Sequence, residues 1–507
     1  MSQKVVVVGT GFGGLASAVR LRAMGYEVEM VEAGDQPGGR ARVFKQDGFS
    51  FDAGPTVVTA PHLLEELFEL VGRDYRDYFE LMPVDPFYRV DFPDGSTFDY
   101  VGDEERLLSQ IHDFNPADVE GYRKLVKKSQ DIFSIGYEQL AHVPFNNLSD
   151  MLRVVPQMLK LQSYKSVYGM VSSYIKDERL RQVFTFQPLL VGGNPFNVSS
   201  IYLLIHWLER KWGVHFAKGG TTAIVKGLER LLTEIGVSIR YNAPVERLEV
   251  SQSGQVTGVV LESGEVIKAT KVVSNADPST VYSKWLDPKM RKKHTDRSVA
   301  RKRQSMSLFV AYFGTKKTYE DIAHHTIVLG PRYKGLLNDV FNKKILADDF
   351  SLYLHAPTRS DPSVAPEGCE NFYVLSPVPN QYSGLNWEDL HDEYLDRILT
   401  HLDQNQLPGL KENIVTKKAI DPRYFQNEMR SYQGNAFGIE PVLQQSAYMR
   451  YHNVSEDVDG LFFVGAATHP GAGLPGVIGS AKVLEEVMPP PLKRQPIPHS
   501  KKIRLVS

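Results

Sequence analysis

The chain has 507 residues, and its 58 Lys and Arg against 60 Asp and Glu give a net charge of −2, which argues against a protein built mainly to bind nucleic acid. Its 42% hydrophobic and 23% charged residues exclude wholesale disorder, and a mean hydropathy of −0.27 excludes a polytopic membrane protein. The single cysteine, Cys369, excludes a multi-cysteine zinc module and favours a reducing, cytoplasmic compartment, so we expect no metal site.

The N-terminus alternates between apolar runs and glycine turns. Residues 5–8 predict a strand, residues 15–24 a helix and residues 27–32 a second strand, and such a βαβ unit predicts a parallel sheet. The segment Gly9-Thr10-Gly11-Phe12-Gly13-Gly14 lies between the first strand and the helix. Glycines there allow a tight turn, a close approach of backbone to a pyrophosphate, and close packing of helix on strand.

Glu32 ends the second strand, where a carboxylate can accept hydrogen bonds from a ribose hydroxyl. An acid at this place favours FAD or NAD over NADP. Pro37-Gly38-Gly39-Arg40 follows and can form a second backbone pocket near the phosphates, with Arg40 neutralising charge, although a surface turn with a solvated arginine is the alternative. We therefore predict a dinucleotide site in the first 40 residues.

The region of about residues 110–215 is helix-rich and aromatic. Between Asp150 and Asp177 it has basic but no acidic residues among many apolar ones, which is typical of a segment that lies in a membrane interface. A buried helical subdomain with basic residues that reach solvent is the alternative. Asp150 and Arg153 are candidate catalytic residues, and the alternative for Asp150 is the N-cap of the helix that follows.

The second half of the chain returns to strands. Gly219-Gly220 opens a helix that reaches residue 235, short alternating strands follow, and residues 290–420 mix strands with helices. A strand at 461–465 leads into another glycine-rich turn, and the basic, proline-rich end of the chain is expected to be mobile.

Several of these segments resemble a known family. Glu32, Gly38-Gly39-Arg40 and Asp52-Ala53-Gly54-Pro55-Thr56 resemble motifs of the flavin-containing amine oxidase and carotenoid desaturase superfamily. The stretch Gly465-Ala466-Ala467-Thr468-His469-Pro470-Gly471-Ala472-Gly473-Leu474-Pro475-Gly476-Val477 is similar to the C-terminal flavin signature of the bacterial and fungal phytoene desaturases. The resemblance covers nearly the whole chain, to about Met488. Ala467 departs from the family's usual glycine, and we expect its extra methyl group to lie beside the flavin.

We expect an α/β fold in which a Rossmann-like FAD-binding domain is joined by a mixed-sheet substrate domain and a helical membrane-associating subdomain. The expected boundaries are 1–110, 215–285 and 420–488 for the discontinuous FAD-binding domain, 110–215 for the helical subdomain, 290–420 for the substrate domain and 489–507 for the mobile tail.

The resemblance implies that FAD is the cofactor. The residues expected to bind it are Gly9, Gly11, Phe12, Gly13, Gly14, Glu32, Gly38, Gly39, Arg40, Gly54, Pro55, Val245, Gly465, His469, Gly473 and Val477. Because the flavin carries the redox chemistry, the protein has to bind and orient the substrate and exclude water, and no catalytic triad or dyad is expected. His469 is either a base or a residue that fixes its loop by hydrogen bonds.

The family introduces double bonds stepwise into the forty-carbon hydrocarbon phytoene, typically reaching lycopene. The resemblance therefore implies a phytoene substrate drawn from the lipid bilayer, a peripheral place on the cytoplasmic membrane, and a quinone or oxygen as terminal electron acceptor. The alternatives are a thirty-carbon diapophytoene desaturase, a hydroxycarotenoid desaturase or a carotenoid oxygenase. An amine oxidase and a non-enzymatic prenyl-binding protein of the same fold, such as a Rab escort protein or GDP-dissociation inhibitor, fit the motifs less well.

Overall fold

A parallel sheet forms the base of the molecule in the computed structural model, which describes residues 3–498. Its five strands run in the order β19-β13-β1-β2-β9, and every neighbouring pair is parallel. The strands are β1 (Lys4–Val8), β2 (Glu27–Val31), β9 (Ser238–Arg240), β13 (Lys271–Ser274) and β19 (Leu461–Phe463). The predicted βαβ unit and parallel sheet are confirmed.

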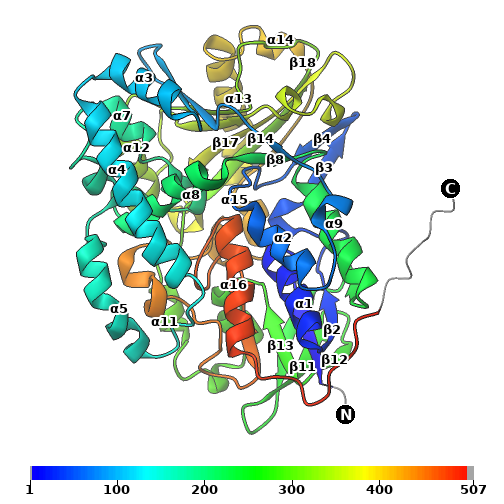
Figure 1. Ribbon diagram of the computed structural model, residues 1–507. Helices are drawn as coiled ribbons and strands as arrows, with labels where there is room; N and C mark the ends of the chain where they lie inside the picture. The colour runs from blue at the N-terminus through cyan, green and yellow to red at the C-terminus, as the bar shows by residue number, and fades with distance from the viewer. Residues whose placement is uncertain (1–2, 499–507) are drawn as a thin grey trace, which may run out of the picture.

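Successive side chains of β1 point to opposite faces of the sheet and pack into two separate layers of the core. Val5 and Val7 pack with helices on one face, whereas Val6 and Val8 pack on the other face with a three-stranded antiparallel sheet. The helices, seen side by side in Figure 1, are α1 (Phe12–Met24), α2 (Pro61–Glu69), α9 (Thr221–Glu234) and α16 (Leu474–Val487). The small sheet consists of β10 (Val245–Val250), β11 (Val256–Leu261) and β12 (Val266–Lys268).

A second, mixed sheet of seven strands lies above the first in Figure 1. Its order is β18-β14-β17-β16-β15-β6-β7, and β15 and β6 are its parallel neighbours. The strands are β6 (Tyr88–Asp91), β7 (Thr97–Tyr100), β14 (Ser307–Thr315), β15 (His325–Val328), β16 (Leu352–His355), β17 (Glu370–Val378) and β18 (Ile414–Ile420). Phe309 and Phe313 of β14 face α13 (Trp387–Gln404), and Tyr312 faces the opposite way, toward the centre of the molecule.

Helices flank the mixed sheet on one side, as Figure 1 shows. They are α3 (Glu104–Phe114), α4 (Asp118–Phe133), α5 (Leu148–Leu161), α6 (Val167–Val171), α7 (Glu178–Val183) and α8 (Leu204–Trp212). The structure differs from the expected boundary at residue 110, because β6 and β7 precede it yet pair within the mixed sheet. Long-range strand pairing of this kind is not encoded in the local pattern of residues 88–100.

The remaining elements are short. They are β3 (Val43–Gln46), β4 (Phe49–Asp52), β5 (Leu81–Pro83), β8 (His215–Ala217), α10 (Pro278–Thr280), α11 (Asp296–Ala300), α12 (Tyr333–Asn338), α14 (Leu410–Asn413) and α15 (Pro422–Asn427). None of the helices within residues 3–498 combines the length and the apolar character needed to span a bilayer.

The chain after α16 lies against α1. The guanidinium group of Arg22 donates to the carbonyl oxygen of Pro496 at 2.7 Å, and the Gln495 amide donates to the carbonyl oxygen of Gly25 at 2.7 Å. The start of the tail expected to be mobile is therefore bound to the surface, at residues 489–498. The rest of that segment, residues 499–507, lies outside the described residues.

Candidate active site

One large cavity lies between the parallel sheet, the mixed sheet and the flanking helices. Its volume is about 560 Å³. Glycine-rich loops line one end, with Gly9, Gly11, Gly38 and Gly39 in its wall. The other end is apolar and reaches α5, where Met151, Val154 and Met158 line it. The cavity thus extends without interruption from the glycine-rich loops to a region lined by apolar side chains.

The turn between β1 and α1 requires glycine. A Cβ atom on Gly14 would lie 2.0 Å from the carbonyl oxygen of Gly9, so any side chain there would push α1 away from the turn. Gly9 itself has a φ of +91°, and Gly38, which forms a bridge with Gly11, has a φ of +110°. Gly11 and Phe12 line the cavity at the start of α1, so the free N–H groups of its first turn face the cavity end where an anion can bind.

Asn275 is a site residue that the sequence did not indicate. It follows β13 and lines the cavity. Cβ atoms on Gly11, Gly13 and Gly465 would lie 2.7, 2.4 and 2.7 Å from its side-chain amide atoms. Gly13, Gly14 and Gly465 are not part of the cavity wall; they let backbone pack around Asn275 and within the turn. A polar residue at the carboxyl end of a parallel strand was the available signal.

Glu32 lines the cavity directly after β2 and is buried. Its carboxylate accepts hydrogen bonds from the backbone N–H of Thr10 and of Gly34, both at 2.9 Å. The bond from Thr10 joins the two glycine loops, and the bond from Gly34 lies within the second loop. The Thr10 hydroxyl also donates to this carboxylate at 2.5 Å, so about one of its roughly four acceptor positions remains for a ligand hydroxyl.

Arg40 is a half-buried cation in the cavity wall beside Gly39. Its Nη2 donates to Ser431 Oγ at 2.7 Å, while its Nε is buried with no partner among residues 3–498. Burial lowers the pKa of the guanidinium group, although nearby Asp277 favours its charged form. An unpartnered cationic donor next to two cavity-lining glycines fits the pyrophosphate of a dinucleotide. The residues present therefore fit FAD.

The loop from β19 to α16 forms another wall, to which His469, Gly473 and Val477 contribute. Burial lowers the pKa of His469 to about 4, so its ring is neutral at pH 7. Its Nε2 lies 3.3 Å from the carbonyl oxygen of Leu140, which matches the loop-fixing role considered for it. Ala467 does not line the cavity: its methyl group faces Gly438, where a Cβ would be 2.7 Å away. The expectation that this methyl lies beside the flavin is therefore wrong.

The other residues expected at the cofactor also line the cavity. Gly54 and Pro55 follow β4, and Val245 begins β10. A Cβ on Gly54 would lie 2.4 Å from the carbonyl oxygen of Arg40, so these two loops touch through backbone. Residues from widely separated parts of the chain thus line the same cavity.

The structure does not support Asp150 and Arg153 as catalytic residues, because neither lines the cavity. Asn147 is the N-cap of α5, and Asp150 completes a capping box by accepting from the Asn147 N–H at 3.2 Å. The Arg153 side chain is 80% exposed and lies 3.9 Å from Asp150. Both residues lie on the outer side of α5, near its N-terminus.

Glu209 on α8 was not indicated by the sequence, where it is a lone acid among aromatic residues. It is fully buried in the cavity wall and accepts a hydrogen bond from the Tyr88 hydroxyl at 2.9 Å. Burial raises the pKa of this carboxyl to about 8, so it is mostly neutral at pH 7. A neutral acid keeps this part of the cavity free of charge.

Known proteins resemble this chain in sequence and in fold. Residues 12–483 match the family described as flavin containing amine oxidoreductase. The chain is 49% identical to the lycopene-forming phytoene desaturase of Pseudescherichia vulneris, over 96% of this chain and 99% of that protein. It is 48% identical to the lycopene-forming enzyme of Pantoea ananas, over 95% and 98%. Among solved structures, putrescine oxidase bound to putrescine has a TM-score of 0.64 at 15% identity, covering 96% of this chain and 98% of that one, which is a likeness of fold alone.

Replacing Glu209 with Gln is expected to change how stability depends on pH. The folded-state pKa of about 8 lies above the ordinary value of 4.5, so this group destabilises the fold progressively as pH rises from about 4.5 to about 8. The amide cannot ionise but still accepts from Tyr88. The thermal midpoint of Glu209→Gln relative to the unmodified chain should therefore rise by several degrees between pH 5 and pH 8. A difference that is flat or falls with pH would contradict the buried neutral carboxyl.

Proposed function

The chain belongs to the flavin containing amine oxidoreductase family, among the bacterial phytoene desaturases, and we propose that it binds FAD and converts phytoene stepwise to lycopene. The observation that carries this proposal is the cavity that continues from the glycine-rich loops to the apolar region at α5. A bound flavin supplies the hydride acceptor for oxidation of a C–C bond. The protein's own part is to hold a hydrocarbon against that acceptor and to keep water out.

The apolar region of the cavity suits an uncharged polyene. Aliphatic and aromatic side chains from the mixed sheet and the helices line it, among them Leu190, Ile327, Leu375 and Phe437. Burying a hydrocarbon against such a wall is favourable by roughly 25 cal/mol per Å² of apolar surface. Glu209 accepts a hydrogen bond from the Tyr88 hydroxyl and is mostly neutral at pH 7, so it places no full charge against the substrate.

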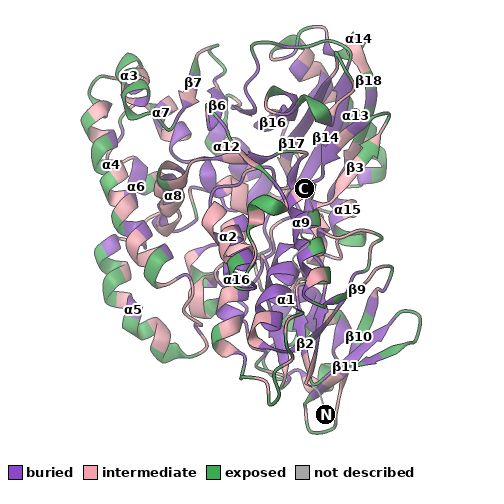
Figure 2. Ribbon diagram, turned by 45° about the vertical axis from the view of Figure 1, so that its right-hand side comes forward, coloured by how far each residue is buried: buried purple, intermediate pink, exposed green. Residues whose placement is uncertain are grey.

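We propose that α5 rests in a membrane interface and admits the substrate. Leu148, Leu152 and Leu159 on its outer face are 53–63% exposed, and Tyr164 just beyond the helix is 62% exposed. Figure 2 shows exposed residues along this helix, at the edge of the molecule. Its inner face lines the cavity, so one helix separates lipid from the active site. Arg153 and Lys160 beside the exposed leucines suit an anionic surface.

This position agrees with the chemistry of the substrate, which has no useful concentration in water. We therefore propose a peripheral protein on the cytoplasmic membrane that takes phytoene from the bilayer. A quinone dissolved in the same bilayer, or oxygen, would then reoxidise the flavin.

Co-expression with a pathway that produces phytoene tests the activity. We expect lycopene as the main pigment on chromatography, with neurosporene or didehydrolycopene fixing a smaller or larger number of steps. Accumulation of unchanged phytoene would contradict the proposal. A thirty-carbon pathway run in parallel distinguishes a diapophytoene desaturase.

A glycine variant at the site and a matched control variant away from it extend this experiment. Gly14→Ala should lose bound flavin and at least nine-tenths of the pigment, because its Cβ would meet the Gly9 carbonyl at 2.0 Å. Gly335→Ala on α12 should retain both, since its nearest neighbours are atoms of the flexible Arg332 side chain, at 3.3 Å or more.

Sedimentation with anionic phospholipid vesicles tests the membrane proposal. The purified protein should co-sediment, and the double variant Leu152→Glu and Leu159→Glu should bind at least tenfold more weakly, because each leucine in the interface contributes roughly 1.5–3 kcal/mol when fully buried. Val415→Glu, at a 48% exposed position on β18, is the matched control and should bind normally. Failure of the unmodified protein to co-sediment would contradict the proposal, as would unchanged binding of the double variant.

A further inference from the structure

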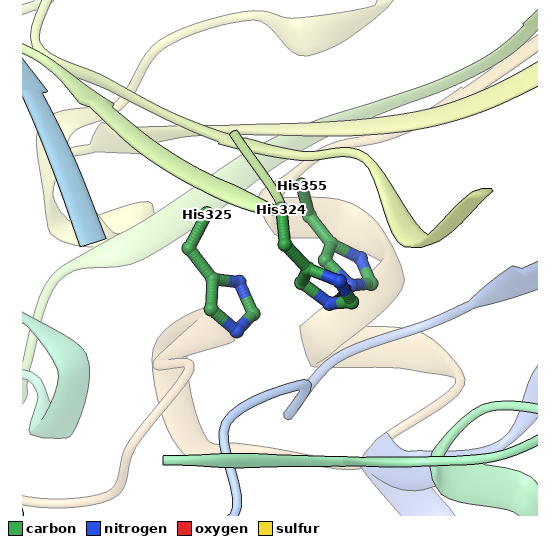
Figure 3. A group of neighbouring side chains, drawn as sticks. All are labelled: His324, His325 and His355. Atoms are coloured by element: carbon green, nitrogen blue, oxygen red, sulfur yellow. Dashed lines mark hydrogen bonds between the residues drawn. The ribbon is translucent and has the colours of Figure 1, made fainter. Parts of the chain in front are cut away.

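Three histidines meet at the junction of β15 and β16. His325 begins β15 and pairs in register with His355, the last residue of β16, while His324 precedes β15. Figure 3 shows the three rings gathered in one place. They are 4%, 0% and 1% exposed for His324, His325 and His355, and one nitrogen from each ring lies within 4.8 Å of the others.

Hydrogen bonding within the group leaves one nitrogen unused. Nε2 of His324 and Nε2 of His355 are 3.0 Å apart, so a single proton between them satisfies both. Nε2 of His325 is buried and has no partner among the described residues. A buried polar atom without a partner is costly unless something else occupies its lone pair. A metal ion would use all three nitrogens.

One pair of the nitrogens is close to the spacing that a small metal ion requires, whereas the third ring, within 4.8 Å of the others, has to approach them by up to about 1.4 Å. Two imidazole nitrogens bound to zinc at about 2.0–2.1 Å in a tetrahedron lie about 3.3–3.4 Å apart. The His324 and His355 nitrogens would have to separate by only a few tenths of an ångström to reach this distance.

Neighbouring hydroxyl groups hold the opposite ring nitrogens. His324 Nδ1 lies 2.7 Å from Ser360 Oγ, and His325 Nδ1 lies 2.7 Å from the Tyr353 hydroxyl, which in turn lies 2.6 Å from Thr56 Oγ1. Hydrogen bonds at Nδ1 fix the ring and leave Nε2 as the ligand, a common arrangement around metal-binding histidines. Burial also lowers the pKa of each imidazole, which favours the neutral form that binds metal.

A surface pocket reaches one of the three rings. His324 and Ser360 line a surface pocket that is separate from the large cavity, and Glu320 and Asp321 line it too. Its two arginines are each paired with a carboxylate. The acidic residues would attract a cation, and three protein ligands leave a fourth position for water.

We infer that His324, His325 and His355 bind one divalent transition-metal ion of the zinc type through their Nε2 atoms. Imidazole ligands favour zinc and its neighbours over magnesium or calcium. Strand pairing brings the three imidazoles together from distant positions, so the sequence, with its single cysteine, indicated no metal site. The ion ties β15 to β16 behind the cavity wall formed by Thr56 and Tyr353.

Metal analysis of the protein purified without a polyhistidine tag tests this inference. After reconstitution with zinc and exhaustive dialysis, we expect about one zinc per chain and a higher thermal midpoint than that of the chelator-treated protein. Reconstitution with cobalt should give the visible d–d absorption of a nitrogen-bound ion. Less than a tenth of an equivalent of zinc together with no cobalt band would overturn the inference, and this result does not depend on any variant folding.

Variants assign the ligands. His325→Ala and His355→Ala should each weaken zinc binding at least tenfold with an unchanged circular dichroism spectrum. His401→Ala on α13 is the matched control, because His401 packs against Phe350 away from the group, and it should bind zinc normally. Equal zinc binding by all three variants would place the metal elsewhere and overturn the assignment.

Discussion

Close packing of glycine backbone around Asn275 is the constraint on which the cofactor end of the molecule depends. Gly11 and Gly13 from the first turn and Gly465 from the last meet the side chain of Asn275, and a Cβ on any of them would lie within 2.7 Å of it. The strand order β19-β13-β1 brings these three segments together. Because no side chain intervenes, backbone N–H groups reach the cavity, and Glu32 and Arg40 can flank the same place.

The opposite end of the cavity has a different requirement. A hydrocarbon needs an apolar wall and a path that avoids water. Val154 of α5 contributes to the apolar wall, and Leu152 on the same helix faces outward. Glu209 is compatible with this end because burial raises the pKa of its carboxyl to about 8, so it is mostly neutral at pH 7. The fold therefore joins a site for a charged dinucleotide to a site for a hydrocarbon inside one cavity.

The sequence predicted those features that depend on interactions between residues close together in the chain. The turn after β1, the acid at Glu32 and the amphipathic segment at α5 could be predicted because glycine geometry, strand ends and helical periodicity act over a few residues. Asn275, Glu209 and the three histidines could not, since each depends on residues brought together from distant parts of the chain. Asp150 is the reverse case: its spacing from Asn147 matches a capping box, a local pattern that explains the residue without catalysis.

A crystal structure of the FAD-loaded protein with a bound carotenoid would show whether flavin and polyene share this cavity. We predict the pyrophosphate beside Gly11 and Gly39, and the polyene running along the apolar region toward Met158. A polyene bound outside this cavity, or a flavin placed away from the glycine loops, would contradict this prediction.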